Sequence, residues 1–449
     1  MTQNLSADFA PLLEAAMARA RKAGADAADA IIGRDISLSV GERMGQREKL
    51  QRSEAQDMGL RVFVGKRQAI VSTSDFNQAG IDELADRAVA MARVVPEDPH
   101  CGLADPADFA KAVAVLDSLD PTEPTEAQLT KLVRTAEAAA RGVKGVTNSE
   151  GAEAGWGRVE VALASSTGFY GAYAQSSFGL SVSVLAGEGT GMERDYDYSS
   201  TVYLADLEDA AALGRSAGER AVKRLNPKKA QTTKVPIVFD PRISSSLVGH
   251  FLGAINGAGI ARGTSFLKDR MSQAVFNAGI EIVDDPHRAR GLRSKPFDGE
   301  GLATRRHVLA ENGVLKTWIL DCRSARQLGL KSTGHAARGA SSPPSPSATN
   351  VHLAAGKISR ADLLKAIDQG FYATELIGSG VNGVTGDYSR GAAGFWIEKG
   401  EIAYPVSEIT IAGNLKDMYQ HLTPADDLVF RYGVNAPTIR VDGMTVAGA

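Results

Sequence analysis

The chain has 449 residues, of which 43% are hydrophobic and 23% charged, a composition typical of a soluble globular protein with two domains. Its 50 basic and 53 acidic side chains give a net charge of -3, which excludes the strongly basic balance of a nucleic-acid-binding protein. No apolar run is long enough to span a membrane and the first residues lack the pattern of a signal peptide, so we expect neither a membrane protein nor a secreted one.

The chain begins with a pattern that predicts helices packed on antiparallel strands. Apolar residues recur at helical spacing over 7–22, whereas alternation between 27 and 74 favours strands. Asp75 is expected to cap the next helix. One face of that helix is expected to be buried, with Ile81, Leu84, Ala88 and Met91.

The next stretch predicts a second set of helices on a strand meander. Thr125-x-x-Gln128 matches a capping box, residues 143–204 alternate as long strands, and a helix is expected over 206–225. The polar residues that follow favour a domain boundary. We therefore predict an N-terminal domain over 1–227 and a C-terminal domain over 235–449.

The second half predicts short strands separated by turns, with few helices. A buried strand, Val235 to Phe239, precedes a helix that Asp240-Pro241 opens and that reaches Ile255. Glu311-Asn312-Gly313 favours a hairpin, residues 341–347 a surface loop, and Ser359 the start of a helix over 361–369. The predicted fold class is α+β: helices on an antiparallel sheet, followed by a mostly antiparallel β domain.

The histidines and cysteines do not form the spacing of a metal site. No two of the seven histidines share a helical turn, and only His250 lies on a predicted helix. Zinc enzymes commonly place two histidines on one helix with a glutamate as base. Cys101 and Cys322 lie far apart in the sequence, so no disulfide is predicted. The absence of a disulfide pattern is typical of proteins of the reducing cytoplasm.

Other candidate chemistry has a simpler structural interpretation. The serines at 244–246 lack the glycines of a nucleophile elbow and are expected to satisfy N–H groups at the start of a helix. The glycines at 253–259 end a helix instead of opening one, which does not suit a phosphate loop. Asp284-Asp285-Pro286 and Asp298-Gly299-Glu300-Gly301 are typical of charged turns, although paired carboxylates could do acid–base chemistry.

A series of motifs in the second half resembles the TldD/PmbA family, and most closely its PmbA (TldE) branch. The resemblance covers about residues 235–449 specifically and the first half only in the order of its elements. The motifs are Arg262-Gly263-Thr264-Ser265-Phe266-Leu267-Lys268-Asp269, Pro296-Phe297-Asp298-Gly299-Glu300-Gly301, Ser332-Thr333-Gly334-His335, Gly386-Asp387-Tyr388-Ser389-Arg390-Gly391, Gly394-Phe395-Trp396-Ile397-Glu398-Lys399-Gly400 and Ile411-Ala412-Gly413-Asn414-Leu415.

The resemblance implies that this chain lacks the family's metal ligands. TldD-type members carry His-Glu-x-x-x-His upstream of Gly-Thr-Ser, and a later cysteine. Counted back from Gly263, those positions fall on Val248, Gly249 and Gly253, and no cysteine lies between 426 and 437. We therefore predict no metal ligand, no catalytic residue and no cofactor site in this chain.

The resemblance further implies a division of labour between two chains. A TldD-type paralogue would hold zinc and cleave unfolded peptides, and this chain would complete a heterodimeric metallopeptidase in the cytoplasm. Family substrates include a microcin precursor and an antitoxin. Where the paralogue is absent, a surface built for a similar chain can pair with itself to form a homodimer.

Two other readings remain open at this point. The chain could be an enzyme on its own, with Asp298 or Glu300 acting together with a histidine. It could instead be a non-enzymatic peptide-binding or regulatory protein.

Overall fold

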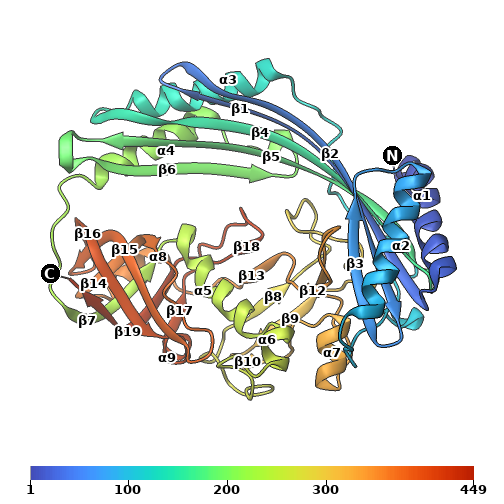
Figure 1. Cartoon of the computed structure of the whole chain (residues 1–449). Helices are drawn as coiled ribbons and strands as arrows, with labels where there is room; N and C mark the ends of the chain where they lie inside the picture. Colours follow the sequence, from blue (N-terminus) through green and yellow to red (C-terminus); the bar gives the residue numbers. More distant parts are fainter. Residues whose placement is uncertain (1, 449) are drawn as a thin grey trace.

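The computed structural model describes residues 2–448, with side chains from residue 8 onward. A long curved sheet with helices along its outer side arches over the C-terminal half of the chain (Figure 1). The helices are α1 (Thr2–Ala23), α2 (Gln78–Val94), α3 (Glu126–Arg141), α4 (Ala210–Lys223), α5 (Pro241–Ala254), α6 (Gly257–Ala261), α7 (Cys322–Leu328), α8 (Arg360–Lys365) and α9 (Leu415–Gln420). Among the described residues, no helix combines the length and hydrophobicity that crossing a membrane requires.

The curved sheet, which we name the arch, has six strands in the order β3-β2-β1-β4-β5-β6. Every neighbouring pair is antiparallel. Four of its strands are 17 to 20 residues long, so the twist of the strands accumulates into pronounced curvature. The strands are β1 (Ala27–Arg43), β2 (Gln46–Val64), β3 (Arg67–Thr73), β4 (Val146–Ser165), β5 (Tyr170–Ala186) and β6 (Glu193–Thr201).

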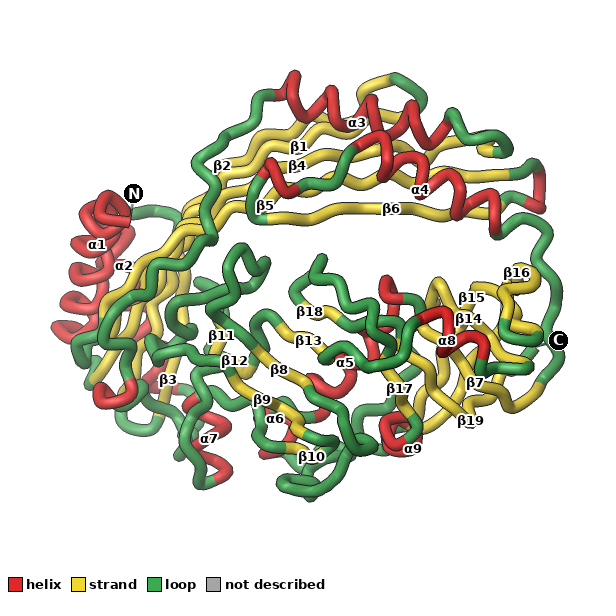
Figure 2. The backbone as a smooth tube through the Cα atoms, turned by 180° about the vertical axis from the view of Figure 1, so that it is seen from behind, coloured by secondary structure: helices red, strands yellow, loops and turns green. Residues whose placement is uncertain are grey.

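Two separate cores lie on the outer face of the arch. At one end α1 and α2 cover Ile32, Met58 and Leu60. At the other end α3 and α4 lie along the sheet (Figure 2), where they cover Leu38 and Trp156. Ile32 and Leu38 are both even-numbered residues of β1, and side chains on a strand alternate between faces, so the two helix pairs share one face. The opposite face of the arch is turned toward the C-terminal half of the chain.

The C-terminal half contains a six-stranded sheet, five strands of which close into a barrel, and a smaller five-stranded sheet. The first has the order β16-β15-β14-β7-β19-β17, and β16 also pairs with β19, which closes a barrel. Its strands are β7 (Thr233–Phe239), β14 (Gln369–Ile377), β15 (Asp387–Glu398), β16 (Glu401–Asn414), β17 (Leu422–Pro424) and β19 (Ile439–Ala447). The second sheet, in the order β10-β9-β8-β13-β18, is formed by β8 (Ile282–Asp284), β9 (His307–Glu311), β10 (Val314–Leu315), β13 (Val351–Leu353) and β18 (Val434–Asn435).

The predicted α+β class is confirmed, as are several local features. Thr125 and Gln128 form a capping box at the start of α3. The hairpin between β9 and β10 turns at Asn312 and Gly313, with φ values of 48° and 78° that a two-residue turn needs. The expected helix after Asp240 is α5, which Pro241 opens.

Several predicted boundaries in the first half were wrong because side-chain partners decided them. Asn77, not Asp75, caps α2 by accepting a hydrogen bond from the Gly80 N–H. Met91 is 43% exposed, so it does not belong to the buried face of that helix. The helix expected from 206 begins at Ala210, because Asp209 accepts a hydrogen bond from Ala212 and caps it there.

Two boundaries in the second half also differ from the prediction. The helix expected over 361–369 is α8, which ends at Lys365 because the chain turns into β14 to pair with β7. Residues 341–347 are not entirely a loop. A short ladder joins β11 (Ala336–Ala337) to β12 (Ser345–Pro346), and it buries Pro346.

Candidate functional site

Helix α5 lies between the barrel and the five-stranded sheet, where the predicted degenerate metal motif falls. It follows the buried strand β7, and Asp240 caps it by accepting a hydrogen bond from the Arg242 N–H. One side of α5 packs into the main C-terminal core through Leu247, Val248 and Phe251. This packing fixes which positions of the helix face away from the core.

The three motif positions on α5 do not fit a zinc ion. Val248 is 3% exposed and points into the core. Gly249 and Gly253 lie one turn apart on the open side, where an added Cβ would meet no atom within 4 Å. Valine and glycine side chains offer no donor atom to a metal. Across residues 2–448, no group of three or more His, Cys, Asp or Glu side chains could hold a metal ion.

His250 is the one metal-ligand residue type on α5, and it stands without a second histidine. Its Nε2 is buried and has no hydrogen-bond partner among the described residues, and the same is true of the Tyr388 hydroxyl. The two rings meet edge to face with centroids 5.9 Å apart. Burial, with a smaller contribution from Arg390, lowers the pKa of His250, so the imidazole is neutral at neutral pH.

The serines at the start of α5 do not satisfy N–H groups there, contrary to expectation. Asp240 caps the helix, and the serine hydroxyls instead donate to backbone carbonyls. Ser244 donates to Ala436 O at 3.3 Å, and Ser246 donates to Ile243 O at 2.6 Å. These hydroxyls are bonded to the backbone, and their arrangement does not indicate a catalytic nucleophile.

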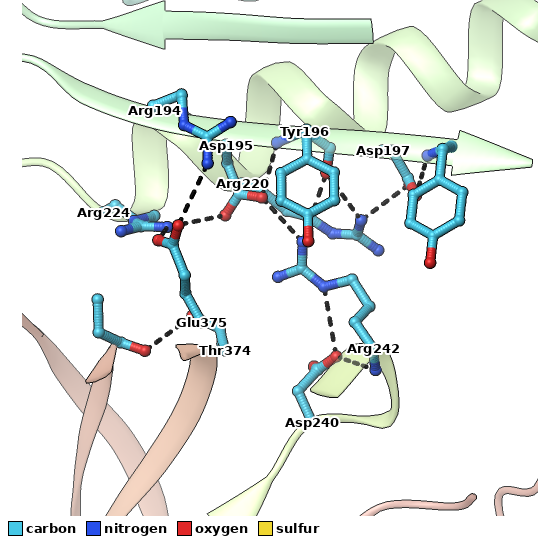
Figure 3. A network of polar contacts seen from close by, with 12 residues as sticks. Arg194, Asp195, Tyr196, Asp197, Arg220, Arg224, Asp240, Arg242, Thr374 and Glu375 are labelled. Carbon is cyan, nitrogen blue, oxygen red and sulfur yellow. Dashed lines mark hydrogen bonds and ion pairs between the residues drawn. The ribbon is translucent and has the colours of Figure 1, made fainter. Parts of the chain in front are cut away.

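A buried ionic network joins the first turn of α5 to the arch (Figure 3). The Arg242 guanidinium donates to Asp195 on β6 at 2.8 Å and lies 3.4 Å from Asp240. Arg224, the C-cap residue of α4, contacts Glu375 on β14 at 2.6 Å and Asp195 at 3.7 Å. We name these residues, Asp195, Arg224, Arg242 and Glu375, the seam.

The charges of the seam are mutually stabilising and largely shielded from solvent. The side chains of Arg242 and Asp195 are 8% and 3% exposed. Burial alone would lower the pKa of Arg242, but Asp195 and Asp240 raise it above its ordinary value. The seam therefore holds the start of α5 in a fixed position against the far end of the arch.

The seam was not predicted from the sequence, although the pattern of residues in β6 indicates buried carboxylates. Asp195 and Asp197 alternate with Tyr196 and Tyr198, and such alternation on a strand places two carboxylates on one face. Both carboxylates are almost fully buried, where they need cationic partners. The partners lie far away in sequence, so only the fold could identify them.

The inner face of the arch contains a groove lined by small polar residues. One hollow of about 530 Å³ lies on the face opposite α3 and α4, and a second of about 860 Å³ adjoins it. The first hollow is lined by Ser37, Ser39, Gly155, Gly157, Ser177 and Gly179. The register of β1, β4 and β5 places these residues side by side across neighbouring strands. The groove thus exposes hydroxyls and backbone, together with larger side chains such as Asp35 and Tyr198.

The Asp298-Gly299-Glu300-Gly301 motif forms a turn, as expected, and both of its carboxylates are buried. Asp298 and Glu300 are 2% and 5% exposed. Asp298 accepts hydrogen bonds from the N–H groups of Glu300, Leu302 and Ala336 at 2.9 to 3.1 Å. Burial, with the nearby charge of Glu300, raises the pKa of Asp298 to about 7. No hydrogen bond joins either carboxylate to a histidine in the part of the chain that the structure describes.

One of these carboxylates, Glu300, belongs to a second buried cluster, at the base of the arch. Asp29 on β1 accepts hydrogen bonds from Arg61 on β2 at 3.1 Å and from Arg338 of the C-terminal half at 2.6 Å. Arg61 also lies 3.8 Å from Glu300. Burial alone would raise the pKa of Asp29, yet the charges of Arg338 and Arg61 hold it below its ordinary value. We name Asp29, Arg61, Glu300 and Arg338 the base cluster.

Asp284 of the predicted Asp284-Asp285-Pro286 turn is the last residue of β8, and its carboxylate is fully buried. It accepts hydrogen bonds from His335 Nε2 at 3.0 Å and from the Thr349 N–H at 2.9 Å. The other ring nitrogen of His335 bonds to Thr333 at 2.8 Å. With both ring nitrogens engaged, His335 supports the loops around β8 and has no free nitrogen for a ligand.

The raised pKa of Asp298 predicts a dependence of stability on pH. The pKa of Asp298 is about 7 in the folded protein and near 3.8 in the unfolded chain. The protonated carboxyl therefore stabilises the folded state fully below about pH 3.8. This stabilisation is lost as the pH rises from there through about 7. Relative to an Asp298→Asn variant, the wild type is expected to lose on the order of 3 kcal/mol between pH 4 and 7. Denaturant unfolding of both proteins at each pH measures the difference.

The Asn variant loses the bond from Ala336, which adds an offset that does not depend on pH. Glu300→Gln is the matched control. It removes a charge that raises the Asp298 pKa, so the loss should move to lower pH. A constant difference between wild type and Asp298→Asn from pH 4 to 8 contradicts the assignment.

Known proteins of the same fold and sequence pattern match almost the whole chain. Models of the PmbA/TldA metallopeptidase family match as domain 1 over residues 28–92, as the central domain over 119–225 and as the C-terminal domain over 232–448. Metalloprotease PmbA of Escherichia coli O157:H7 is 35% identical over 94% of this chain and 92% of its own length. A PmbA homologue of Haemophilus influenzae is 34% identical over 96% of this chain and 94% of its own length. The crystal structure of TldE from Thermococcus kodakarensis shares the fold, with a TM-score of 0.86 at 20% identity over 97% of this chain and all of that one.

Proposed function

This chain belongs to the PmbA/TldD metallopeptidase family, and from that membership we propose that it is the non-metal subunit of a two-chain peptidase. A TldD-type paralogue would supply the zinc ion and the cleavage chemistry. The observation that carries the proposal is α5, which has Val248, Gly249 and Gly253 where the family's metal motif falls. Helix α5, its N-cap Asp240 and the seam are all present. In this proposal the chain therefore keeps the scaffold of the metal site but lacks the metal-ligand side chains.

In this proposal the chain contributes a wall for binding an unfolded peptide. The groove on the inner face of the arch presents hydroxyl and backbone groups that can bond to an extended peptide with little selection for its side chains. Gly249 and Gly253 leave the open side of α5 without side chains, so a neighbouring chain can approach the helix closely. A folded protein cannot lay a single strand along such a groove, which restricts substrates to unfolded peptides.

The proposed setting is the cytoplasm, and the proposed task is the degradation or maturation of peptides such as a microcin precursor. Both cysteines, Cys101 and Cys322, are buried and form no disulfide. Unpaired buried thiols suit a reducing compartment. Burial raises the pKa of Cys322, with Glu300 adding to the effect, so this thiol stays protonated and does not act as a nucleophile.

Reconstitution with the paralogue tests the proposal. The purified chain alone is expected to leave an unfolded fluorogenic peptide intact, the mixture with a TldD-type chain is expected to cleave it, and a chelator should abolish that cleavage. Metal analysis of the chain alone should show no stoichiometric zinc. The matched control replaces the glutamate of the paralogue's metal motif, which should remove activity from the mixture.

Three outcomes would contradict the proposal. Cleavage by this chain alone after chelator treatment would indicate an enzyme in its own right. Stoichiometric zinc in this chain would refute the alignment of the motif with α5. Peptide binding without cleavage in any mixture would favour a peptide-binding or regulatory protein.

A further inference from the structure

A pocket of about 430 Å³ lies between the helices of the arch and the C-terminal half of the chain. Its wall is formed by α4 and the loop before it, by the first turn of α5, by the start of α8 and by residues 427–436. We name it the junction pocket. Its volume is within the range in which proteins bind small molecules.

The wall of the junction pocket is strongly charged, and most of its charges already have partners. Four arginines and three carboxylates line it. Five of these seven groups take part in ion pairs, which are Arg431–Glu208, Arg220–Asp197, Arg242–Asp195 and Arg242–Asp240. The pairs hold one another in place and leave two charged side chains of the wall for a ligand.

The two remaining side chains, Arg360 and Asp427, have no ionic partner among residues 8–448. The Arg360 guanidinium lies 5.0 Å from the ring centroid of Tyr372 and donates no hydrogen bond within that range. Asp427 accepts hydrogen bonds from the N–H of Thr438 at 2.8 Å and from its hydroxyl at 2.7 Å. These two bonds orient the carboxylate but do not neutralise it, so the pocket has one unpaired charge of each sign.

The local chain brings these two side chains to the same pocket. Ile358 and Ala425 form a parallel bridge, and the N–H of Asp426 donates to the Ile358 carbonyl at 2.9 Å. The two segments therefore leave the bridge side by side. Arg360 and Asp427 each follow two residues beyond it, and both line the pocket without pairing with each other.

Arg242 adds a second cationic donor to the wall. Its Nη1 donates to Asp195 and its Nε to Asp240, whereas its Nη2 donates no hydrogen bond in the part of the chain that the structure describes. The side chain is only 8% exposed. A bond from an arginine to a carboxylate is stronger at such a shielded place than at an open surface. The pocket thus offers two guanidinium donors and one carboxylate acceptor.

We propose that the junction pocket binds a short peptide as a zwitterion, with the peptide's carboxylate at Arg360 and Arg242 and its ammonium at Asp427. An inorganic anion fits less well, because it would meet the Asp427 carboxylate. Val429, which is 63% exposed, and Tyr432 supply apolar surface for a small side chain of the ligand. Only the source of the ligand rests on the proposed function, because degradation of a peptide releases such fragments.

Titration of the purified chain with the dipeptide dialanine tests the proposal. Dialanine is expected to bind with measurable heat in isothermal titration calorimetry. N-acetyl-dialanine lacks the ammonium and dialanine amide lacks the carboxylate, so each is expected to bind on the order of tenfold more weakly or worse. Inorganic phosphate should also bind more weakly than dialanine. Binding is measured without the paralogue, so a chain that binds dialanine but supports no cleavage contradicts only the peptidase proposal.

An Arg360→Gln variant locates the site, because this exposed side chain can be replaced without disturbing the core. It is expected to weaken dialanine binding by on the order of tenfold. The matched control is Lys365→Gln, which removes a 67% exposed charge from the same helix outside the pocket and should leave binding unchanged. Circular dichroism should show that both variants are folded.

Four results overturn the proposal. They are no binding of dialanine by the wild type at millimolar concentration, equal binding of dialanine and its two blocked forms, tighter binding of phosphate, and equal effects of Arg360→Gln and Lys365→Gln.

Discussion

An Asp29→Ala variant is expected to lose about 3–5 kcal/mol of the free energy of unfolding, because it leaves two buried arginines without their shared carboxylate. The Arg61 and Arg338 side chains are 4% and 0% exposed. Arg61 keeps only a 3.8 Å contact with Glu300. Arg338 Nε and Nη2 already lack partners among the described residues, so this guanidinium would lose its only ion pair there. Denaturant unfolding measures the loss.

The matched control for this prediction is Asp35→Ala on the same strand, whose carboxylate forms no ion pair among the described residues. It should change the free energy of unfolding by less than about 1 kcal/mol. Hydrogen exchange should locate the Asp29→Ala effect at β1, β2 and the loop around Arg338. Equal losses in the two variants would show that the base cluster contributes little.

An Arg242→Ala variant is expected to lose about 3 kcal/mol, because it leaves the buried carboxylate of Asp195 with only the 3.7 Å contact to Arg224. Its matched control is Arg194→Ala at the edge of the same network. Arg194 also contacts a carboxylate, Glu375 at 3.2 Å, but its side chain is 42% exposed. An exposed pair of this kind is worth less than about 1 kcal/mol.

The position of the Arg242 effect is as informative as its size. Hydrogen exchange should rise in the first turn of α5 and in β6, while the base cluster at the other end of the arch stays protected. A uniform increase across the chain, or a loss no greater than that of Arg194→Ala, would contradict the role of the seam in positioning α5.

Local features of the fold could be predicted from sequence because their causes lie within a few residues. The capping box at Thr125, the turn at Asn312 and Gly313 and the proline that opens α5 each act through neighbouring backbone groups. The start of α4 could not be placed, because Asp206 and Asp209 are both possible caps in the sequence and Asp209 is the one that caps the helix. The end of α8 could not be placed, because it depends on the pairing of β14 with β7.

The charged clusters could not be predicted because burial is decided by distant parts of the chain. Asp298 and Glu300 stand among glycines, which locally favours an exposed turn, yet β1, β2 and α7 surround them. Asp284 meets His335 across 51 residues and Asp195 meets Arg242 across 47. In contrast, Val248, Gly249 and Gly253 can be assessed from the sequence alone, because valine and glycine side chains have no metal-donor atom wherever the fold places them.

The long strands of the arch make its two helical ends depend on each other. β4 and β5 run under both helix pairs, so the segments 28–92 and 119–225 share one continuous hydrogen-bond ladder although family models match them separately. A fragment of residues 119–225 would carry β4 with the whole of its β1 side bare, and would be prone to aggregate. Truncation at the gap between these segments therefore offers no route to a smaller soluble module, and insertions there would have to leave the β1–β4 ladder intact.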